Sequence, residues 1–191
     1  MESYIVRWNG SVNSPYLEYM IYTILKGRHR VSKFPIKFWT GHFHLIYKVR
    51  FDDSWKQSYP GEYKDDVSKL LGIGCFHLAY LLKWKPPHHW KSTRAGIDYN
   101  ETLDVLDVYK YIYNNGARSF RKVFEFHFNT DYHIHIYKTP DATAISICDT
   151  NDNTLISFAG PPWGGISYLL RPYYGGNNPA RIDTITHIKR L

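Results

Sequence analysis

The sequence has few cysteines and no long apolar run. Its 191 residues include two cysteines, Cys75 and Cys148, and neither belongs to a CxxC pair. Two thiols cannot form the disulfide framework of a small secreted scaffold, so we expect both to be free and buried. No uninterrupted apolar stretch approaches the roughly 20 residues that a membrane-spanning helix needs. No membrane span is therefore expected.

The chain also lacks the signatures of several functional classes. It contains no GxSxG elbow, HExxH pair, P-loop or zinc-finger spacing. The first residues, MESYIVRWNGSVNSPYLEY, lack the basic start and apolar core of a secretory signal. This predicts a cytoplasmic protein, or one released or assembled without such a signal. Basic residues outnumber acidic ones by 24 to 17, and the resulting charge of +7 favours anionic partners. Because the basic residues are scattered, nucleic acid is not the expected partner.

Aromatic residues are what the sequence has in excess. Tyr, Phe and Trp make up 17% of the chain, and such residues suit pleated strands better than helices. Strict alternation from His42 to Phe51 predicts a half-buried strand with Phe43, Leu45, Tyr47, Val49 and Phe51 on one face. A second alternating run extends from Thr102 to Tyr113. Further short strands are expected at Phe124 to Phe128, Tyr132 to Tyr137, Ala144 to Cys148, Thr154 to Phe158, Ser167 to Tyr173 and Asp183 to Ile188.

These runs predict the fold class and the domain organisation. The turn signal Asn129-Thr130-Asp131 indicates a hairpin between two of the runs, and the best helix candidate is one short segment, Lys64 to Leu71. Many short strands separated by turn residues favour an all-β protein with little helix. We expect a two-sheet antiparallel sandwich of jelly-roll type with roughly 10–12 strands. Residues 1–20 are expected to be an N-terminal arm or edge strand, and 21–191 a single domain.

Seven strings, read in order, carry a resemblance. They are YTILKG (Tyr22 to Gly27), FPIKFWTG (Phe34 to Gly41), YKVRFDDS (Tyr47 to Ser54), DVSKLLGIG (Asp66 to Gly74), HHWKSTRAG (His88 to Gly96), LDVYKYIYNNGAR (Leu106 to Arg118) and LLRPYYGGNNPA (Leu169 to Ala180). Their order resembles a group of uncharacterised bacterial proteins, seen especially in Bacteroidetes, with DxNKLxGF, HHxxNSAR, LEIxAYxYxNGxR and PYFGGNxPAPHD segments. The resemblance implies ancestry and no activity. Lys91 stands where that group has Asn.

The last of these strings carries a second, looser resemblance. It is similar to the final strands of concanavalin A-like jelly rolls, in which a GG turn precedes an AP-containing strand. Such jelly rolls include polysaccharide lyases and sugar-binding modules. The resemblance implies the same jelly-roll fold and a carbohydrate-related role.

Histidines are the first candidates for chemistry. His133 and His135 would project from the same side of one strand, and a third ligand from His42, His44 or His127 would complete a zinc-like set. No acidic or cysteine ligand at a diagnostic spacing supports such a set. We therefore expect imidazoles that line a polar sheet face, with no metal and no cofactor.

Tyrosine and histidine together could also perform proton transfer. A tyrosine–histidine pair can move protons in the cleavage of an acidic sugar while a nearby basic residue neutralises the carboxylate. The weak catalytic candidates are His133, His135, Tyr109 and Tyr111.

Loop aromatics suggest a binding surface. Sugar rings stack on exposed Trp and Tyr, and amide or guanidinium groups bind the hydroxyls. Prolines and paired glycines near these rings indicate stiff loops, which lower the ordering cost of binding. We expect at least two of the ring residues Trp90, Trp163, Tyr173 and Tyr174 to share a solvent-facing cleft, with Arg171, Asn177 or Asn178 near enough to bind hydroxyls or a carboxylate.

One arginine is expected to be structural. Arg94 enters a strand, where an inward-facing guanidinium is costly unless it is bonded. We expect Arg94 to be at least half-buried and bonded to several carbonyls or to a carboxylate, with Asp66 and Asp98 as candidates.

Together these features favour a non-catalytic binding module, with a carbohydrate as the ligand. Two alternatives stay open. One is a structural or assembly protein of a virion or other large particle, and the other is a lyase that acts on an acidic polysaccharide. The expected partner is a glycan or a protein, and an oligomer is compatible with the sequence.

Overall fold

The computed structural model of the chain describes residues 20–31, 37–57, 67–139, 141–175 and 179–191. These residues form twelve strands, one short α-helix and two 3₁₀ turns. The strands are β1 (Met20–Ile24), β2 (Phe38–Trp39), β3 (Phe43–Phe51), β4 (Ser68–Cys75), β5 (Lys91–Asn100), β6 (Val105–Asn114), β7 (Ala117–Phe126), β8 (Tyr132–Lys138), β9 (Thr143–Cys148), β10 (Thr154–Gly160), β11 (Ser167–Leu170) and β12 (Thr184–Arg190). The helical elements are η1 (Asp53–Trp55), α1 (Leu78–Leu82) and η3 (Pro87–His89). The predicted arm over residues 1–20 falls almost wholly outside the described residues.

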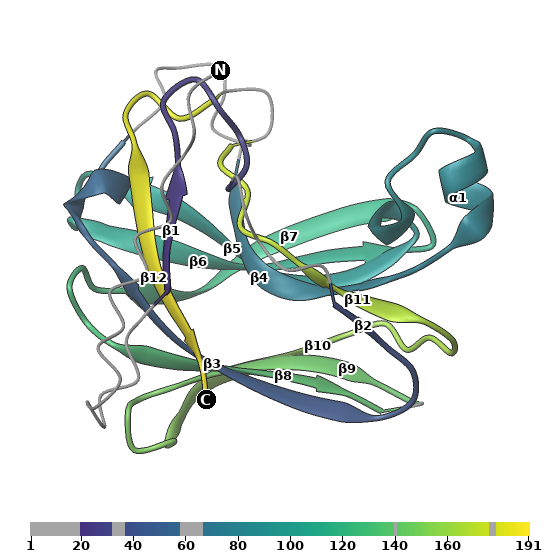
Figure 1. The fold of residues 1–191 in the computed structure, drawn as a ribbon. Coiled ribbons are helices and arrows are strands. Elements are labelled where there is room, and N and C mark those ends of the chain that lie inside the picture. The colour runs from purple at the N-terminus through teal and green to yellow at the C-terminus, as the bar shows by residue number, and fades with distance from the viewer. Residues whose placement is uncertain (1–19, 32–36, 58–66, 140, 176–178) are drawn as a thin grey trace, which may run out of the picture.

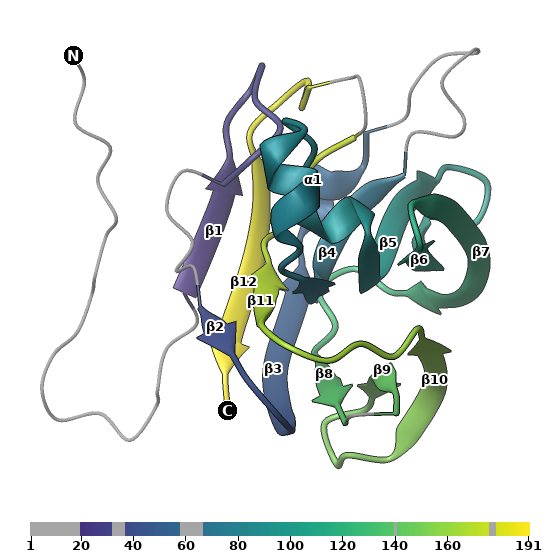
Figure 2. The ribbon, with the colours of Figure 1, turned by 90° about the vertical axis from the view of Figure 1, so that its right-hand side faces the viewer.

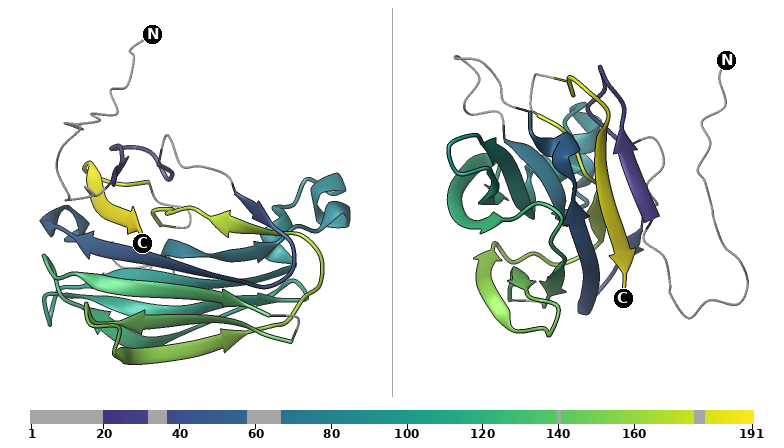
Figure 3. Two further views of the ribbon diagram at one scale, coloured as in Figure 1. Left: turned by 60° about the horizontal axis from the view of Figure 1, so that its bottom comes forward. Right: turned by 90° about the vertical axis from the view of Figure 1, so that its left-hand side faces the viewer.

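The strands form two antiparallel sheets of six strands each. Sheet A has the order β1-β12-β3-β8-β9-β10, and sheet B has the order β2-β11-β4-β5-β6-β7. The two sheets face each other as the layers of a sandwich, and α1 projects beyond them at one end (Figure 1). Views from the two sides show β1 and β12 along one flank of the molecule and β10 below β7 on the other (Figures 2 and 3). The predicted all-β sandwich is confirmed.

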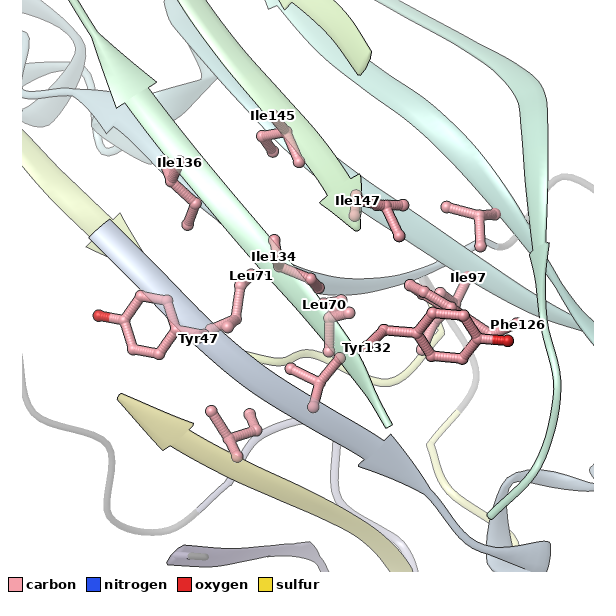
Figure 4. Packing of buried hydrophobic residues seen from close by; sticks show 14 of the residues in the cluster. Tyr47, Leu70, Leu71, Ile97, Phe126, Tyr132, Ile134, Ile136, Ile145 and Ile147 are labelled. Atoms are coloured by element: carbon pink, nitrogen blue, oxygen red, sulfur yellow. The ribbon is translucent and has the colours of Figure 1, made fainter. Parts of the chain in front are cut away.

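The core lies between the two sheets. The alternation from Phe43 to Phe51 is confirmed, since Leu45, Tyr47, Val49 and Phe51 are buried while the side chains between them are more exposed. Isoleucines of β8 and β9 pack from sheet A toward leucines and isoleucines of sheet B (Figure 4). Burying each such side chain contributes about 1.5–3 kcal/mol. Cys75 and Cys148 are free and buried, as expected.

The expected helix from Lys64 to Leu71 is wrong where the structure describes it. Residues 64–66 lie outside the described part, and β4 begins at Ser68. Every residue of β4 is buried: the strand lies between β11 and β5, one face packs on the core, and Arg94 and His88 lie over its glycines on the other face. A strand that is buried on both faces has a continuous apolar sequence without alternation. Hydrophobic periodicity cannot distinguish such a sequence from that of a short buried helix.

The expected hairpin after Phe128 is also wrong. β7 pairs with β6 in sheet B, whereas β8 pairs with β3 and β9 in sheet A, so the turn joins the two sheets. Aromatic rings on either side of the turn pack across the two sheets. Phe126 and Tyr132 are both buried, with ring centroids 4.6 Å apart, and they pack against each other within the core. The two rings, one from each sheet, bury apolar surface against each other across the sandwich, which stabilises this connection.

A buried polar contact links the two sheets beside Gly160. The hydroxyls of Thr93 on β5 and Thr143 on β9 lie 2.6 Å apart, and both residues are fully buried. The Thr143 hydroxyl also lies 3.1 Å from the carbonyl oxygen of Pro161. Gly160 packs directly on this pair, because a Cβ atom there would lie 1.7 Å from Oγ1 of Thr93. The contact leaves no room for a side chain.

Gly160→Ala is therefore expected to lower the free energy of unfolding by about 2–3 kcal/mol, the usual cost of overpacking a rigid core. Gly164→Ala is the matched control, since a Cβ atom at Gly164 meets nothing within 4 Å. Urea unfolding of both variants checks the prediction. Equal stability of the two variants would contradict it.

Candidate functional site

A row of residues crosses the outer face of sheet B, the face turned away from sheet A. Cross-strand register places Gly72 of β4 opposite Arg94 of β5, Arg94 opposite Tyr111 of β6, and Tyr111 opposite Phe120 of β7. Residues directly opposite each other in antiparallel strands project from the same side of the sheet. A Cβ atom at Gly72 would lie 2.6 Å from Cγ of Arg94. The glycine thus provides the space in which the arginine side chain lies.

A parallel row runs beside it. Register places Tyr168 of β11 opposite Gly74, Gly74 opposite Ser92, and Ser92 opposite Tyr113. His88 from η3 lies over Gly74, where a Cβ atom would be 2.6 Å from the Cβ of His88. The Tyr168 hydroxyl accepts a hydrogen bond from the His88 backbone N–H at 3.0 Å and lies 2.8 Å from Nδ1 of that imidazole. Two glycines of β4 therefore make room for two nitrogen-bearing side chains.

Arg94 is the central cation of this face. Its side chain is buried, with 7% of the residue exposed, and Nη2 donates to the carbonyl oxygens of Arg171 at 2.6 Å and Leu70 at 3.4 Å. This confirms the expected burial and the bonds to carbonyls. Among the described residues Asp98 is not a hydrogen-bond partner of Arg94, and Asp66 lies outside the described part. Nε is buried without a hydrogen-bond partner. Burial lowers the pKa of Arg94 to about 10, so the guanidinium stays charged at neutral pH.

Other cations gather around Arg94. Nζ of Lys69 lies 5.3 Å from the ring centroid of Tyr111 and 5.5 Å from that of Tyr173, and Cζ of Arg30 lies 5.8 Å from the Tyr173 centroid. Distances below about 6 Å are those of cation–π contacts.

The same cations act on His88. The pKa of His88 is lowered to about 2 by burial, then by the charge of Arg94, with smaller contributions from His89, Arg30 and Lys69. The His88 imidazole is therefore neutral at physiological pH.

The opposite end of the face is acidic. Asp107 lies across from Asp98 in the β5–β6 register, and Nζ of Lys122 lies 2.6 Å from Asp107 and 2.7 Å from Glu125. Charge on this face is thus segregated along the strands. An anionic ligand would be attracted to the end that holds Arg94 and repelled from the end that holds the carboxylates.

Two of the rings expected to form the ligand cleft belong to the core instead. Trp163 and Tyr174 are 6% and 2% exposed. Nε1 of Trp163 donates to Oγ of Ser167 at 2.9 Å, and the Tyr174 ring packs on Trp55 with centroids 5.6 Å apart. Their loops fold inward because burying a large ring stabilises the sandwich more than exposing it. These two rings therefore cannot line a solvent-facing cleft.

The other expected ligand residues are dispersed. Trp90 is partly buried in a ring cluster with His77 and Tyr80, at centroid distances of 5.0 and 5.5 Å. Tyr173 stacks on His29 with centroids 5.3 Å apart, at the basic end of sheet B. Arg171 is half-buried and contributes its carbonyl oxygen to Arg94. Asn177 and Asn178 lie outside the described residues. Of the expected set, Tyr173 and Arg171 lie beside Arg94.

The structure separates the four weak catalytic candidates into two groups. Tyr109 and Tyr111 are on β6 of sheet B, and His133 and His135 are on β8 of sheet A. Each pair faces away from the core of the sandwich, as the burial of the alternate residues shows. A catalytic tyrosine–histidine pair drawn from these four residues therefore does not form.

Sequence reasoning missed several members of the sheet B face. Lys69, His88 and Tyr168 were not among the predicted ligand-binding or catalytic residues. The two-residue spacing of Gly72 and Gly74 could have indicated this face. Glycines that alternate in a strand indicate the close approach of another group on one face.

A second polar cluster lies on the outer face of sheet A. Nδ1 of His133 lies 2.5 Å, and Nε2 of His135 lies 3.2 Å, from the same carboxylate oxygen of Asp152. His44 of β3 places Nε2 3.1 Å from Nδ1 of His135. Burial, followed by His135, lowers the pKa of His44, and the hydrogen bond with His133 lowers the pKa of Asp152. The β9–β10 turn thus places beside these histidines a carboxylate that the sequence spacing did not reveal.

No protein-family model and no curated protein matches the chain. Solved structures do match. Alginate lyase AlyC3 is 14% identical, with a TM-score of 0.55, over 91% of this chain and 75% of that one. A functionally unknown protein from Saccharomyces cerevisiae is 10% identical, with a TM-score of 0.50, over 83% of this chain and 72% of that one. At such identities the likeness shows the fold alone, a β-sandwich of jelly-roll type. Among the described residues, no helix is long and apolar enough to cross a membrane.

Proposed function

We propose that the outer face of sheet B binds a carboxylate-bearing polysaccharide. The observation that carries this proposal is the state of Arg94. Its charge is buried, its hydrogen-bond partners are carbonyl oxygens, and Nε has none. A buried cation with no carboxylate partner among the described residues keeps an uncompensated positive charge, which favours an anion supplied from outside.

The surroundings of Arg94 fit a sugar chain. Half-buried rings of Tyr113, Tyr168 and Tyr173 stand on the same face. His89 stacks on Tyr113 and His29 on Tyr173, so a pyranose ring would pack on the parts of these rings that stay exposed. Exposed Arg30 and Arg118 provide further positive charge at the rim. This moves the expected carbohydrate surface from the loops to the sheet.

The fold agrees with the proposal but does not establish it. One solved structure of the same fold is an alginate lyase, and alginate is an acidic polysaccharide. Because one fold supports many functions, a shared fold does not transfer a substrate. Support for an anionic ligand therefore comes from this chain's own residues and their charge.

Binding measurements test the proposal. By calorimetry, polyuronates such as alginate and polygalacturonate are expected to bind, a neutral polysaccharide such as dextran is not, and added salt is expected to weaken binding. Arg30→Ala is expected to weaken binding roughly 3- to 10-fold as a rim charge. Arg190→Ala, an exposed cation on β12 of sheet A, is the control and is expected to bind as the wild type does. If no polyuronate binds, the proposal fails and the structural or assembly alternative becomes the better one.

Eliminative cleavage is a second candidate, favoured by the contact between Tyr168 and His88 beside Arg94. In such a reaction a base removes the proton next to the carboxylate carbon, a carbon–carbon double bond forms, and the glycosidic oxygen leaves with a proton from an acid. Arg94 would neutralise the carboxylate. The unsaturated product absorbs ultraviolet light, so a rise in absorbance with polyuronate identifies a lyase. Binding without that rise identifies a non-catalytic module.

A further inference from the structure

The cluster on the outer face of sheet A takes no part in the site proposed above. His133 and His135 alternate on β8, so both imidazoles leave the same side of the strand. Asp152 lies in the turn between β9 and β10, which the register places beside His133 because His133 pairs with Cys148, the last residue of β9. One ligand atom from each of His133, His135 and Asp152 lies within 4.8 Å of the others. The three side chains converge on one point.

The turn that carries Asp152 is held in place by its own hydrogen bonds. Oδ1 of Asp149 accepts from the backbone N–H groups of Asn151 and Asn153 at 2.8 and 2.9 Å, and the Asp149 N–H donates to the Asn153 carbonyl at 3.0 Å. Asp152 has a left-handed backbone with φ of 64°. Its carboxylate is therefore positioned by the turn before any ligand arrives.

A second layer of contacts orients His135. Nε2 faces the Asp152 carboxylate, while Nδ1 lies 3.1 Å from both the His44 imidazole and the Tyr137 hydroxyl. The rings of His44 and Tyr137 are stacked, with centroids 4.2 Å apart. Imidazoles that bind metals usually bond through the second nitrogen in this way, which fixes the tautomer and the ring plane.

The exposed fractions of the three side chains are also those of a metal site that is open to solvent on one side. The two histidines are 8% and 6% exposed, whereas the Asp152 side chain is 55% exposed. The nitrogen ligands are thus shielded and the carboxylate side is open to solvent. Two imidazoles and one carboxylate with an open fourth position are a usual Zn²⁺ donor set.

We propose that His133, His135 and Asp152 bind one Zn²⁺ ion, with solvent as the fourth ligand. Ligand atoms about 2.0–2.2 Å from Zn²⁺ in a tetrahedron are about 3.3 Å apart, so small rotations of these side chains complete the site. The ion would join the β9–β10 turn to β8. Cys148 lies opposite His133 in the β8–β9 register but does not belong to the group of converging ligand atoms. Its Sγ lies 3.8 Å from Oγ1 of Thr154.

Metal titration of the tag-free full chain tests this proposal. After removal of metal with a chelator, calorimetry with zinc chloride is expected to show a step of one equivalent, and Zn²⁺ is expected to raise the melting temperature. Co²⁺ is expected to give the visible absorption bands of a tetrahedral site. Asp152→Asn and His133→Ala are expected to lose the one-equivalent step and the bands. His44→Gln is expected to weaken Zn²⁺ binding about 10- to 100-fold, the usual effect of changing a residue that hydrogen-bonds to a metal ligand.

Two controls separate this site from scattered histidines. Cys148→Ser changes a neighbour that is not a ligand, and His127→Ala removes an exposed histidine elsewhere. Both are expected to bind one equivalent as the wild type does. The Asp152 side chain is largely exposed, so Asp152→Asn is expected to fold even if His133→Ala does not, and circular dichroism checks this. The absence of a one-equivalent step in the wild type, or its survival in Asp152→Asn, would overturn the proposal and leave an ordinary histidine–carboxylate contact.

Discussion

Replacing Arg94 by methionine is expected to weaken polyuronate binding about 10- to 100-fold, the value of a lost hydrogen bond to a charged group. The same change is expected to leave the protein folded and at least as stable. Arg94 is buried, bonds only carbonyl oxygens and has no carboxylate partner among the described residues. Removing an incompletely bonded buried charge removes a desolvation cost, and an unbranched apolar chain can occupy the same space above Gly72.

Alanine at the same position separates charge from volume. Arg94→Ala is expected to lower the free energy of unfolding by about 2–4 kcal/mol, because it leaves a cavity where the aliphatic part of the side chain packed. Calorimetry with alginate and urea unfolding measure the two effects, and Arg190→Met is the control for loss of one positive charge. Wild-type binding by Arg94→Met, or its unfolding, would show that Arg94 is a structural residue and not an anion ligand.

The stability of the protein is expected to fall steeply on mild acidification because of His88. Its folded-state pKa is about 2, whereas an unfolded histidine has a pKa of about 6.5. Below about pH 6.5 the unfolded chain binds a proton that the folded protein does not bind, so the free energy of unfolding decreases as the pH falls. The loss from this one residue is up to about 1.4 kcal/mol per pH unit. Above about pH 6.5 the residue contributes no pH dependence.

His88→Asn tests this expectation. Asparagine offers an amide in place of Nδ1, so the contact with Tyr168 can be kept without a titrating group. Urea unfolding between about pH 5 and 6.5 is expected to show a shallower pH dependence for this variant than for the wild type. His127→Asn, at an exposed position, is expected to keep the wild-type slope. Equal slopes for His88→Asn and the wild type would contradict the proposed burial of a neutral imidazole among cations.

The sequence by itself determined the class of fold and the facing of individual strands. Buried and more exposed side chains alternate from Phe43 to Phe51 and along β6. This alternation follows from the two-residue period of a single strand, so it can be predicted without knowing which strand pairs with it. The burial of Arg94 and of the two thiols also followed from the sequence. Each of these features depends on one side chain or on one short run.

Only the tertiary structure decided which residues meet. The segment between Phe126 and Tyr132 has the sequence features of a hairpin turn, but the strands on either side belong to different sheets and the two rings pack together in the core. That places Tyr111 and His135 on different sheets, so these two catalytic candidates do not form a pair. The same long-range pairing brings together residues with no sequence signal in common, such as Gly72 beside Arg94 and Asp152 beside His133. Cross-strand register is set by burial of the inner sheet faces over the whole domain, and a single strand cannot specify it.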